Sequence, residues 1–202
     1  MPPTTLLDDV ARVVIDEEAL QQRVHELGER ISADYAGKRP VMVGVLHGVA
    51  LFMADLLRAV TIPVVLDFMA IVPYGKSSPS GTVRITKDLD HTISGRHVLF
   101  VEDVIDTGLT LSYLLNVLGT RGPASVNVCV LFDRPYRRLI DIPLAYRGFE
   151  LPDEFVVGYG LDDHGYYRNL PFVGLLKPEA HDALAHRVTS SPRTTTECSV
   201  TS

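Results

Sequence analysis

The stretch from Val98 to Leu111 combines residue types that could bind a sugar and a phosphate. Its sequence is VLFVEDVIDTGLTL, in which four apolar residues lead into two adjacent carboxylates, Glu102 and Asp103, and Asp106 follows. Adjacent carboxylates can hold the hydroxyl groups of a ribose, either directly or through a hydrated magnesium ion. Ligands bind at the carboxyl ends of the strands in an open parallel sheet, so these acids stand where a substrate would be expected.

The four residues after Asp106 should form the turn that opens a helix. They are Thr107, Gly108, Leu109 and Thr110. Such a turn presents unpaired amides and the positive end of the helix dipole, which suits a phosphate. The alternative is that the three acids only cap the helix, but three acids, two hydroxyls and a glycine in one turn favour a binding site. The sequence contains neither a Walker loop nor a Gly-x-Gly-x-x-Gly fingerprint, which argues against a P-loop NTPase or a nicotinamide enzyme.

Strands that alternate with helices should position this turn. Apolar runs predict strands at residues 41–46, 64–72, 82–86, 97–101, 126–132 and 155–159. Helical spacing predicts helices from 16–18 to about 37, from 49 to 60 and from 107 to 118. This alternation predicts an α/β fold with right-handed crossovers and a largely parallel sheet.

Composition favours one soluble domain. The chain has 202 residues, 46% of them hydrophobic, and a net charge of −6 without a basic stripe, which argues against nucleic-acid binding. The two cysteines stand far apart, so a disulfide framework or zinc site is not expected, and Cys129 should be a core residue. No signal peptide or membrane span is evident, which makes the cytoplasm the expected location. Residues 1–180 should form the domain, and 181–202 a disordered tail.

The segment from Val98 to Leu111 resembles the phosphoribosyl-pyrophosphate motif of type I phosphoribosyltransferases, and most closely that of hypoxanthine-guanine phosphoribosyltransferases. A second run, LPDEFVVGYGLD at 151–162 followed by YRNLP at 167–171, is similar to the base-binding hood segment of that family. The resemblance extends from about Val41 to Lys177. It implies the type I phosphoribosyltransferase fold, with a central, mostly parallel five-stranded sheet flanked by helices. A small hood would come from the N-terminal region and residues 144–177.

The resemblance implies roles for the acidic turn. Asp106 would be the general base that accepts a proton from the attacking purine, a task that suits a carboxylate within hydrogen-bond reach. Glu102 and Asp103 would contact the ribose hydroxyls, with or without Mg²⁺. The residues that would wrap the 5-phosphate are Thr107, Gly108, Leu109 and Thr110.

The resemblance also implies a base site and a pyrophosphate site. Phe155 would stack on the base, and Val156 would offer backbone groups to its edge. Asp162 would border the base and hold a second Mg²⁺ on the pyrophosphate. Arg168 would grip the pyrophosphate itself, as a planar guanidinium can by paired hydrogen bonds. The alternative, on the pattern alone, is that Phe155 is the first core residue of a strand and Arg168 a structural residue.

Four positions depart from the family pattern. The pyrophosphate loop Leu46-His47-Gly48 has His47 where relatives usually carry Lys or Arg, and Val49 where Gly or Ser is common. The family has a cis peptide bond at the position of Leu46–His47. Pro73 replaces the usual serine before Tyr74, the tyrosine of the flexible lid. Arg134 falls where the family has a lysine that contacts the 6-oxygen of the purine. His47 could equally be a surface histidine and Tyr74 an ordinary loop aromatic.

The implied reaction moves the 5-phosphoribosyl group of 5-phosphoribosyl 1-diphosphate to hypoxanthine or guanine in purine salvage, with Mg²⁺, and releases pyrophosphate. One alternative keeps the reaction but changes the base to a modified purine or a 7-deazapurine. Another is a non-catalytic regulator that binds the pyrophosphorylated sugar and RNA, which the net charge and the presence of Asp106 disfavour. An unrelated sugar-nucleotide binder would leave the Phe155-to-Arg168 segment unexplained. The resemblance also implies a homodimer or homotetramer, with neither nucleic acid nor membrane as a partner.

Overall fold

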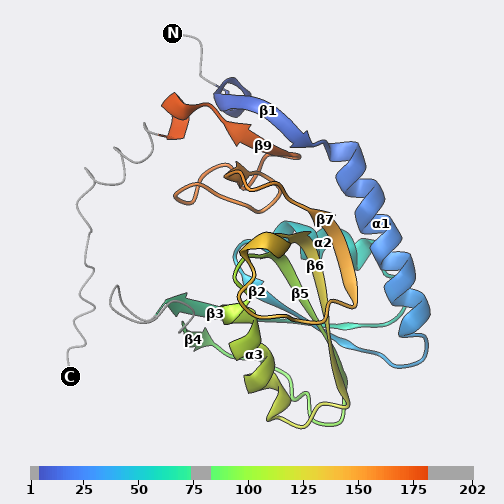
Figure 1. The fold of residues 1–202 in the computed structure, drawn as a ribbon. Helices are drawn as coiled ribbons and strands as arrows, with labels where there is room; N and C mark the ends of the chain where they lie inside the picture. Colours follow the sequence, from blue (N-terminus) through green and yellow to red (C-terminus); the bar gives the residue numbers. More distant parts are fainter. Residues whose placement is uncertain (1–4, 74–82, 182–202) are drawn as a thin grey trace, which may run out of the picture.

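The computed structural model describes residues 5–73 and 83–181, and its main body is one six-stranded sheet with helices on both faces (Figure 1). The strand order is β4-β3-β2-β5-β6-β7. The strands are β2 (Val41–Leu46), β3 (Val65–Pro73), β4 (Val83–Lys87), β5 (His97–Ile105), β6 (Ser125–Asp133) and β7 (Tyr146–Glu150). Five of them are parallel, and β4 runs antiparallel to β3 at one edge. The predicted α/β fold with a mostly parallel sheet is confirmed, with β4 as a sixth strand.

The central strands bury both of their faces, which explains their continuous apolar sequences. In β5, Leu99 and Val101 join a core cluster with α1 (Glu17–Asp34) and α2 (Ala50–Ala59). Val98 and Phe100 point the other way, into a second cluster with α3 (Leu109–Gly119). Side chains on a strand alternate between its faces, so one apolar run supplies both layers.

Helix α1 begins where the acidic residues predicted a helix start. The side chain of Asp16 accepts a hydrogen bond of 2.8 Å from the amide of Ala19, an N-cap contact that satisfies one free amide of the first turn. Leu20, Val24 and Leu27 are buried at helical spacing, and Cys129 is a buried core residue as predicted. Helix α1 therefore covers one face of the sheet together with α2.

A small antiparallel sheet lies over the carboxyl ends of the main strands (Figure 1). Its order is β1-β9-β8, with β1 (Val10–Ile15), β9 (Val173–Leu176) and β8 (Val156–Val157). Two 3₁₀ turns complete the elements, η1 (Leu6–Asp9) and η2 (Pro135–Arg137). The stretch 144–177, predicted as hood, divides in two, because β7 extends the main sheet while β8 and β9 join the small one.

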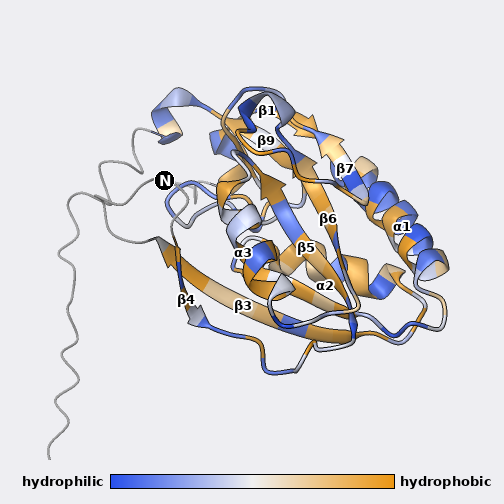
Figure 2. Ribbon diagram, turned by 60° about the horizontal axis from the view of Figure 1, so that its bottom comes forward, coloured by the Kyte–Doolittle hydropathy of each residue, from blue (hydrophilic) through white to orange (hydrophobic). Residues whose placement is uncertain are grey.

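Several element boundaries differ from the sequence prediction, and three of them affect the site. Strand β5 continues past the predicted end at 101 to Ile105, because its pairing with β6 extends to Ile105 and Asp133. Glu102 and Asp103 are therefore part of the strand, and Figure 2 shows a polar segment within the otherwise apolar β5. Helix α3 starts two residues later than predicted, and the strand predicted at 155–159 shortens to β8. Within the described residues, no helix is both long and apolar enough to cross a membrane.

Candidate active site

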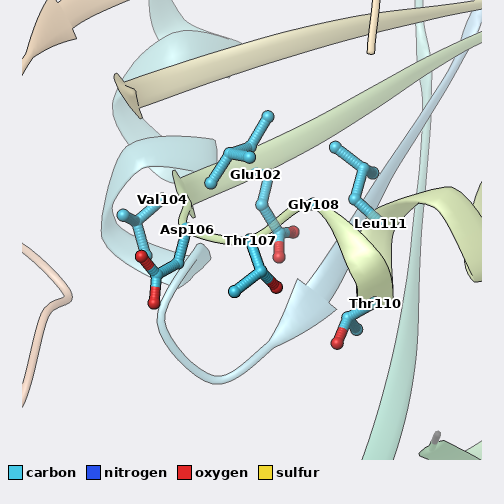
Figure 3. Close-up of a pocket in the computed structure, with 8 residues that line it drawn as sticks. Glu102, Val104, Asp106, Thr107, Gly108, Thr110 and Leu111 are labelled. Atoms are coloured by element: carbon cyan, nitrogen blue, oxygen red, sulfur yellow. The ribbon is translucent and has the colours of Figure 1, made fainter. Parts of the chain in front are cut away.

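The turn between β5 and α3 encloses a pocket of about 210 Å³ (Figure 3). Five of its lining residues are predicted site residues, namely Glu102, Asp106, Thr107, Gly108 and Thr110. The apolar part of the lining comes from Val104, Ile105 and Leu111. Two of the three acids and both hydroxyls that the sequence placed on one turn thus share one pocket at the carboxyl end of the central strand.

Glu102 and Asp103 divide between two sides of β5, as successive residues of a strand must. Glu102 lines the pocket, and its Oε2 is buried without a hydrogen-bond partner among the described residues. Burial and the neighbouring Asp103 carboxylate raise the pKa of Glu102 well above its ordinary value. A buried, unpaired carboxyl oxygen is costly, so this side chain is placed as a ligand-binding group would be.

Asp103 faces Gly48 and Arg168 instead of the pocket. A Cβ atom at Gly48 would overlap Asp103 Oδ2 and come within 3.3 Å of Arg168 Nη1. Burial raises the pKa of Asp103, although the amide of Val104 and the charge of Arg168 partly offset this effect. Asp103 therefore connects the acidic turn with the loop after β2.

The amino end of α3 is shaped by Gly108. This residue caps the helix with φ +80°, a left-handed conformation that glycine adopts without strain. A Cβ there would also come within 3.2 Å of the carbonyl oxygen of Ile140. The first amides of a helix lack acceptors within the helix, so this end of α3 can receive an anion.

The loop after β2 reaches the site at Gly48, which lies against Asp103 and Arg168. The peptide bond between Leu46 and His47 is cis, as the family resemblance implied, and His47 is exposed. A Cβ at Gly160 would overlap the carbonyl oxygen of Gly48, so the two loops are in close contact. Glycine at position 160 permits this approach, whereas glycine at position 48 leaves room for the Asp103 carboxylate.

Arg168 and Asp162 form an ion pair beside this loop. Arg168 Nη2 lies 2.7 Å from Asp162 Oδ1, and Nη1 donates to the carbonyl oxygen of Gly160 at 2.5 Å. The second carboxyl oxygen of Asp162 accepts from the amide of Gly165 at 2.6 Å. The predicted pyrophosphate residues are thus brought together with Gly48 and Asp103.

Of the predicted base residues, Arg134 follows β6 and Phe155 immediately precedes β8. Arg134 is buried, and its Nη2 donates to the carbonyl oxygen of Glu154 at 2.9 Å, while its Nε has no partner among the described residues. Phe155 is 54% exposed, and Val156 is buried in β8. An aromatic ring so exposed at the start of a core strand is available to stack on a ligand.

Sequence reasoning missed Arg137, which contacts the predicted general base. Its Nε lies 3.0 Å from Asp106 Oδ1, although the groups are not aligned as a hydrogen bond and both side chains are about half exposed. Arg137 belongs to η2, a turn that packs next to the β5–α3 loop through the bond from the Leu139 amide to the Thr107 carbonyl oxygen. No local sequence pattern indicates this contact, because it depends on how η2 folds back. The predicted lid residue Tyr74 lies outside the described residues.

Residues 14–164 match the family model described as the phosphoribosyl transferase domain. The chain belongs to the phosphoribosyltransferase family. That match includes every predicted site residue except Arg168.

Relatives of this phosphoribosyltransferase match nearly the whole of their own length. It is 48% identical over 177 residues to the hypoxanthine-guanine phosphoribosyltransferase of Streptococcus agalactiae, covering 87% of this chain and 98% of the relative. It is 45% identical over 176 residues to the enzyme of that name from Bacillus subtilis, with the same coverage of 87% and 98%. The agreement therefore extends over the small sheet as well as the main one.

Solved structures agree with the fold. A hypoxanthine phosphoribosyltransferase from Staphylococcus aureus superposes with a TM-score of 0.83 at 42% identity, covering 89% of this chain and 98% of that one. A hypoxanthine-guanine phosphoribosyltransferase from Bacillus anthracis, solved with a HEPES molecule in the active site, has a TM-score of 0.80 at 40% identity, with coverage of 84% and 100%.

Proposed function

We propose that this phosphoribosyltransferase moves the 5-phosphoribosyl group of 5-phosphoribosyl 1-diphosphate to hypoxanthine or guanine, giving the nucleoside monophosphate and pyrophosphate in purine salvage. The observation that carries the proposal is the β5–α3 turn, which gathers carboxylates in one pocket with the amino end of a helix. Relatives named for this reaction at 45% to 48% identity support it.

Two kinds of group in the turn bind the sugar phosphate: amides and hydroxyls bind its phosphate, and carboxylates bind its ribose. The amides and hydroxyls of residues 107–110 bind the 5-phosphate, because the positive end of α3 favours an anion there. Glu102 and Asp103 bind the ribose hydroxyls. The buried Oε2 of Glu102 lacks a partner among the described residues, and a hydroxyl donor would satisfy it.

Asp106 receives the proton of the base. As the purine nitrogen attacks the anomeric carbon, pyrophosphate leaves and the N–H proton passes to the Asp106 carboxylate. The same negative charge stabilises the positive charge that develops on the ribose in the transition state. Arg137, which lies at Oδ1 of Asp106, leaves the other carboxyl oxygen to accept this proton.

The pyrophosphate is bound where the two glycine loops meet. The amides of Leu46, His47 and Gly48 and the guanidinium of Arg168 surround its position, with Asp162 paired to the guanidinium. Glu102, Asp103 and Asp162 also fit Mg²⁺, which takes oxygen ligands from one or two carboxylates and from substrate phosphates. Within the described residues these three carboxylates do not form one metal-ligating cluster, so oxygens of the substrate would have to complete the coordination of the ion. When bound, Mg²⁺ neutralises charge on the leaving pyrophosphate.

The base lies between Phe155 and the turn. Phe155 stacks on its face, the backbone of Val156 meets its edge, and Arg134 donates to the 6-oxygen. One Arg134 nitrogen is already bonded to the carbonyl oxygen of Glu154, which fixes the direction of the guanidinium. Because Arg134 is longer and more forked than lysine, a modified purine or 7-deazapurine is the second candidate base.

The reaction can be tested directly. The purified protein is incubated with 5-phosphoribosyl 1-diphosphate, Mg²⁺ and a panel of purines and 7-deazapurines, and the nucleotides formed are identified by mass spectrometry. Hypoxanthine and guanine should give the highest kcat/KM. A faster 7-deazapurine would move the assignment to the second candidate, and no nucleotide from any base would contradict both.

The family resemblance also leads us to propose a homodimer or homotetramer in the cytoplasm. Light scattering coupled to gel filtration would measure the mass against 22.2 kDa for one chain. Cell fractionation would test the location, and recovery in the membrane fraction would contradict it.

A further inference from the structure

A buried carboxylate with a histidine on each side lies next to Phe155. Asp163 is only 3% exposed, and its Oδ2 is 2.7 Å from Nδ1 of His181. Its Oδ1 faces Nε2 of His164 at 3.7 Å. The two imidazole rings are stacked, with centroids 6.5 Å apart and planes 25° from parallel. A buried carboxylate is costly unless it is paired, and here the partner at hydrogen-bond distance is His181.

His181 also contacts the ring of Phe155. Their centroids are 5.5 Å apart, with the planes tilted by 53°. Within the described residues, the ring of His164 contacts that of His181 but not that of Phe155, although His164 faces the same carboxylate. His181 is thus the member of the cluster that joins Asp163 to the exposed aromatic ring.

The elements that carry these residues are fixed independently of the cluster. Strand β9 pairs with β8 through Leu175 and Val156, which places the residues after β9 near Phe155. The amide of His181 bonds to the carbonyl oxygen of Lys177 at 3.3 Å. Asp163 exchanges backbone hydrogen bonds with Tyr166 at 3.1 and 2.9 Å. Both partners therefore have anchored backbones, and their side chains meet beside an otherwise exposed phenyl ring.

We propose that Asp163 and His181 are positioning residues for base binding: Asp163 fixes the imidazole of His181, and the imidazole holds Phe155 in the orientation that stacks on the purine. This inference rests on the proposed function, in which Phe155 is the stacking residue. Without the imidazole, Phe155 would rotate more freely and would have to be ordered each time a base binds, which weakens binding.

The proposal predicts a change in KM rather than in kcat. Stacking is made alike in the substrate complex and in the transition state, and interactions of that kind lower KM without raising kcat. His181→Ala should therefore raise the KM for guanine about threefold to tenfold, the range for loss of one aromatic contact or one hydrogen bond. The KM for 5-phosphoribosyl 1-diphosphate and kcat should change less than about twofold.

His164→Ala is the matched control, because it removes the other histidine of the same carboxylate. It should leave the KM for guanine within about twofold of the wild-type value. Asp163→Asn should raise this KM as His181→Ala does, and the double variant should be no worse than either single one, since the residues act as a unit. Equal effects of His164→Ala and His181→Ala, or additive effects of the two positioning variants, would overturn the proposal.

A second readout does not depend on catalysis. The chain has no tryptophan, so Phe155→Trp introduces a single indole at the stacking position, which can be excited selectively over the tyrosines. Adding His181→Ala should lower the fluorescence anisotropy of the introduced indole, whereas adding His164→Ala should not. Unchanged anisotropy together with an unchanged KM would refute the inference while leaving the proposed function intact. If the wild type showed no turnover but the anisotropy change were present, the proposed function would be refuted and the contact between His181 and Phe155 would stand.

Discussion

Glu102→Gln should stabilise the protein without ligand while lowering its activity. Oε2 of Glu102 is buried without a hydrogen-bond partner among the described residues, and the Asp103 carboxylate lies next in the chain. Both features disfavour the charged form, which is why the pKa of Glu102 is raised well above its ordinary value. Glutamine keeps the shape of the side chain and removes the charge.

The size of the effect follows from that unpaired oxygen. Leaving a buried polar group unsatisfied costs about 1 to 3 kcal/mol, and a neutral amide at the same place costs less than a carboxylate. A gain of about 1 to 2 kcal/mol is therefore expected. For a chain of 202 residues, each kcal/mol shifts Tm by about 2 to 4 °C, so Tm should rise by about 2 to 8 °C.

The stability advantage of Glu102→Gln over the wild type should increase as pH rises. The folded protein holds the Glu102 proton to a higher pH than the unfolded chain does, so wild-type stability falls as pH rises from the ordinary carboxyl pKa through the raised folded value. Glutamine does not ionise, so the variant does not lose stability in this way as pH rises. Its advantage in Tm should be small near pH 4 and should grow as pH rises.

The assay is a set of thermal melts of the ligand-free proteins between pH 4 and pH 8. Glu29→Gln is the control, because this carboxylate is exposed on α1 and its replacement should change stability by less than about 0.5 kcal/mol. In parallel, the KM of Glu102→Gln for 5-phosphoribosyl 1-diphosphate should rise. A lower Tm for Glu102→Gln, or an advantage that shrinks as pH rises, would refute the reasoning.

Three further substitutions test the remaining parts of the site. Asp106→Asn should lower kcat by about two to four orders of magnitude, the range for general acid–base assistance, with little change in the KM for the sugar phosphate; unchanged turnover in a pyrophosphate-release assay would remove Asp106 from its role. Gly48→Ala should raise that same KM about tenfold or more, because its Cβ would overlap Asp103 Oδ2 and push the loop away at about 1 to 3 kcal/mol. Arg134→Met should lower kcat/KM for guanine about tenfold to hundredfold by removing the donor to the 6-oxygen; an equal loss for a purine without that oxygen would contradict the contact.

The sequence predicted the central strands of the main sheet because these strands are buried on both faces, but it did not predict the edge strand β7. Continuous apolar runs such as 41–46 and 97–101 are typical of such strands, and both are present as β2 and β5. Polar residues inside a strand interrupt the apolar run, so the same reasoning predicts the end of the strand too early. Glu102 and Asp103 belong to β5, but only the pairing of β5 with β6 through Ile105 shows it.

The candidate site was predicted as far as it depends on residues close together in the chain. Glu102, Asp106 and Thr107 share a pocket because one turn carries them. The contacts of Arg137 with Asp106 and of His181 with Asp163 join residues 31 and 18 positions apart, through a turn and a strand whose paths are set by packing. No local pattern encodes such contacts.

The central claim is that one turn binds both the ribose and its phosphate. A crystal structure of the complex with guanosine 5′-monophosphate tests it most directly. The phosphate should lie within about 3 Å of the amides of residues 107–110, with the ribose hydroxyls at Glu102 and Asp103 and the base against Phe155. A phosphate bound elsewhere, with this turn empty, would contradict the account.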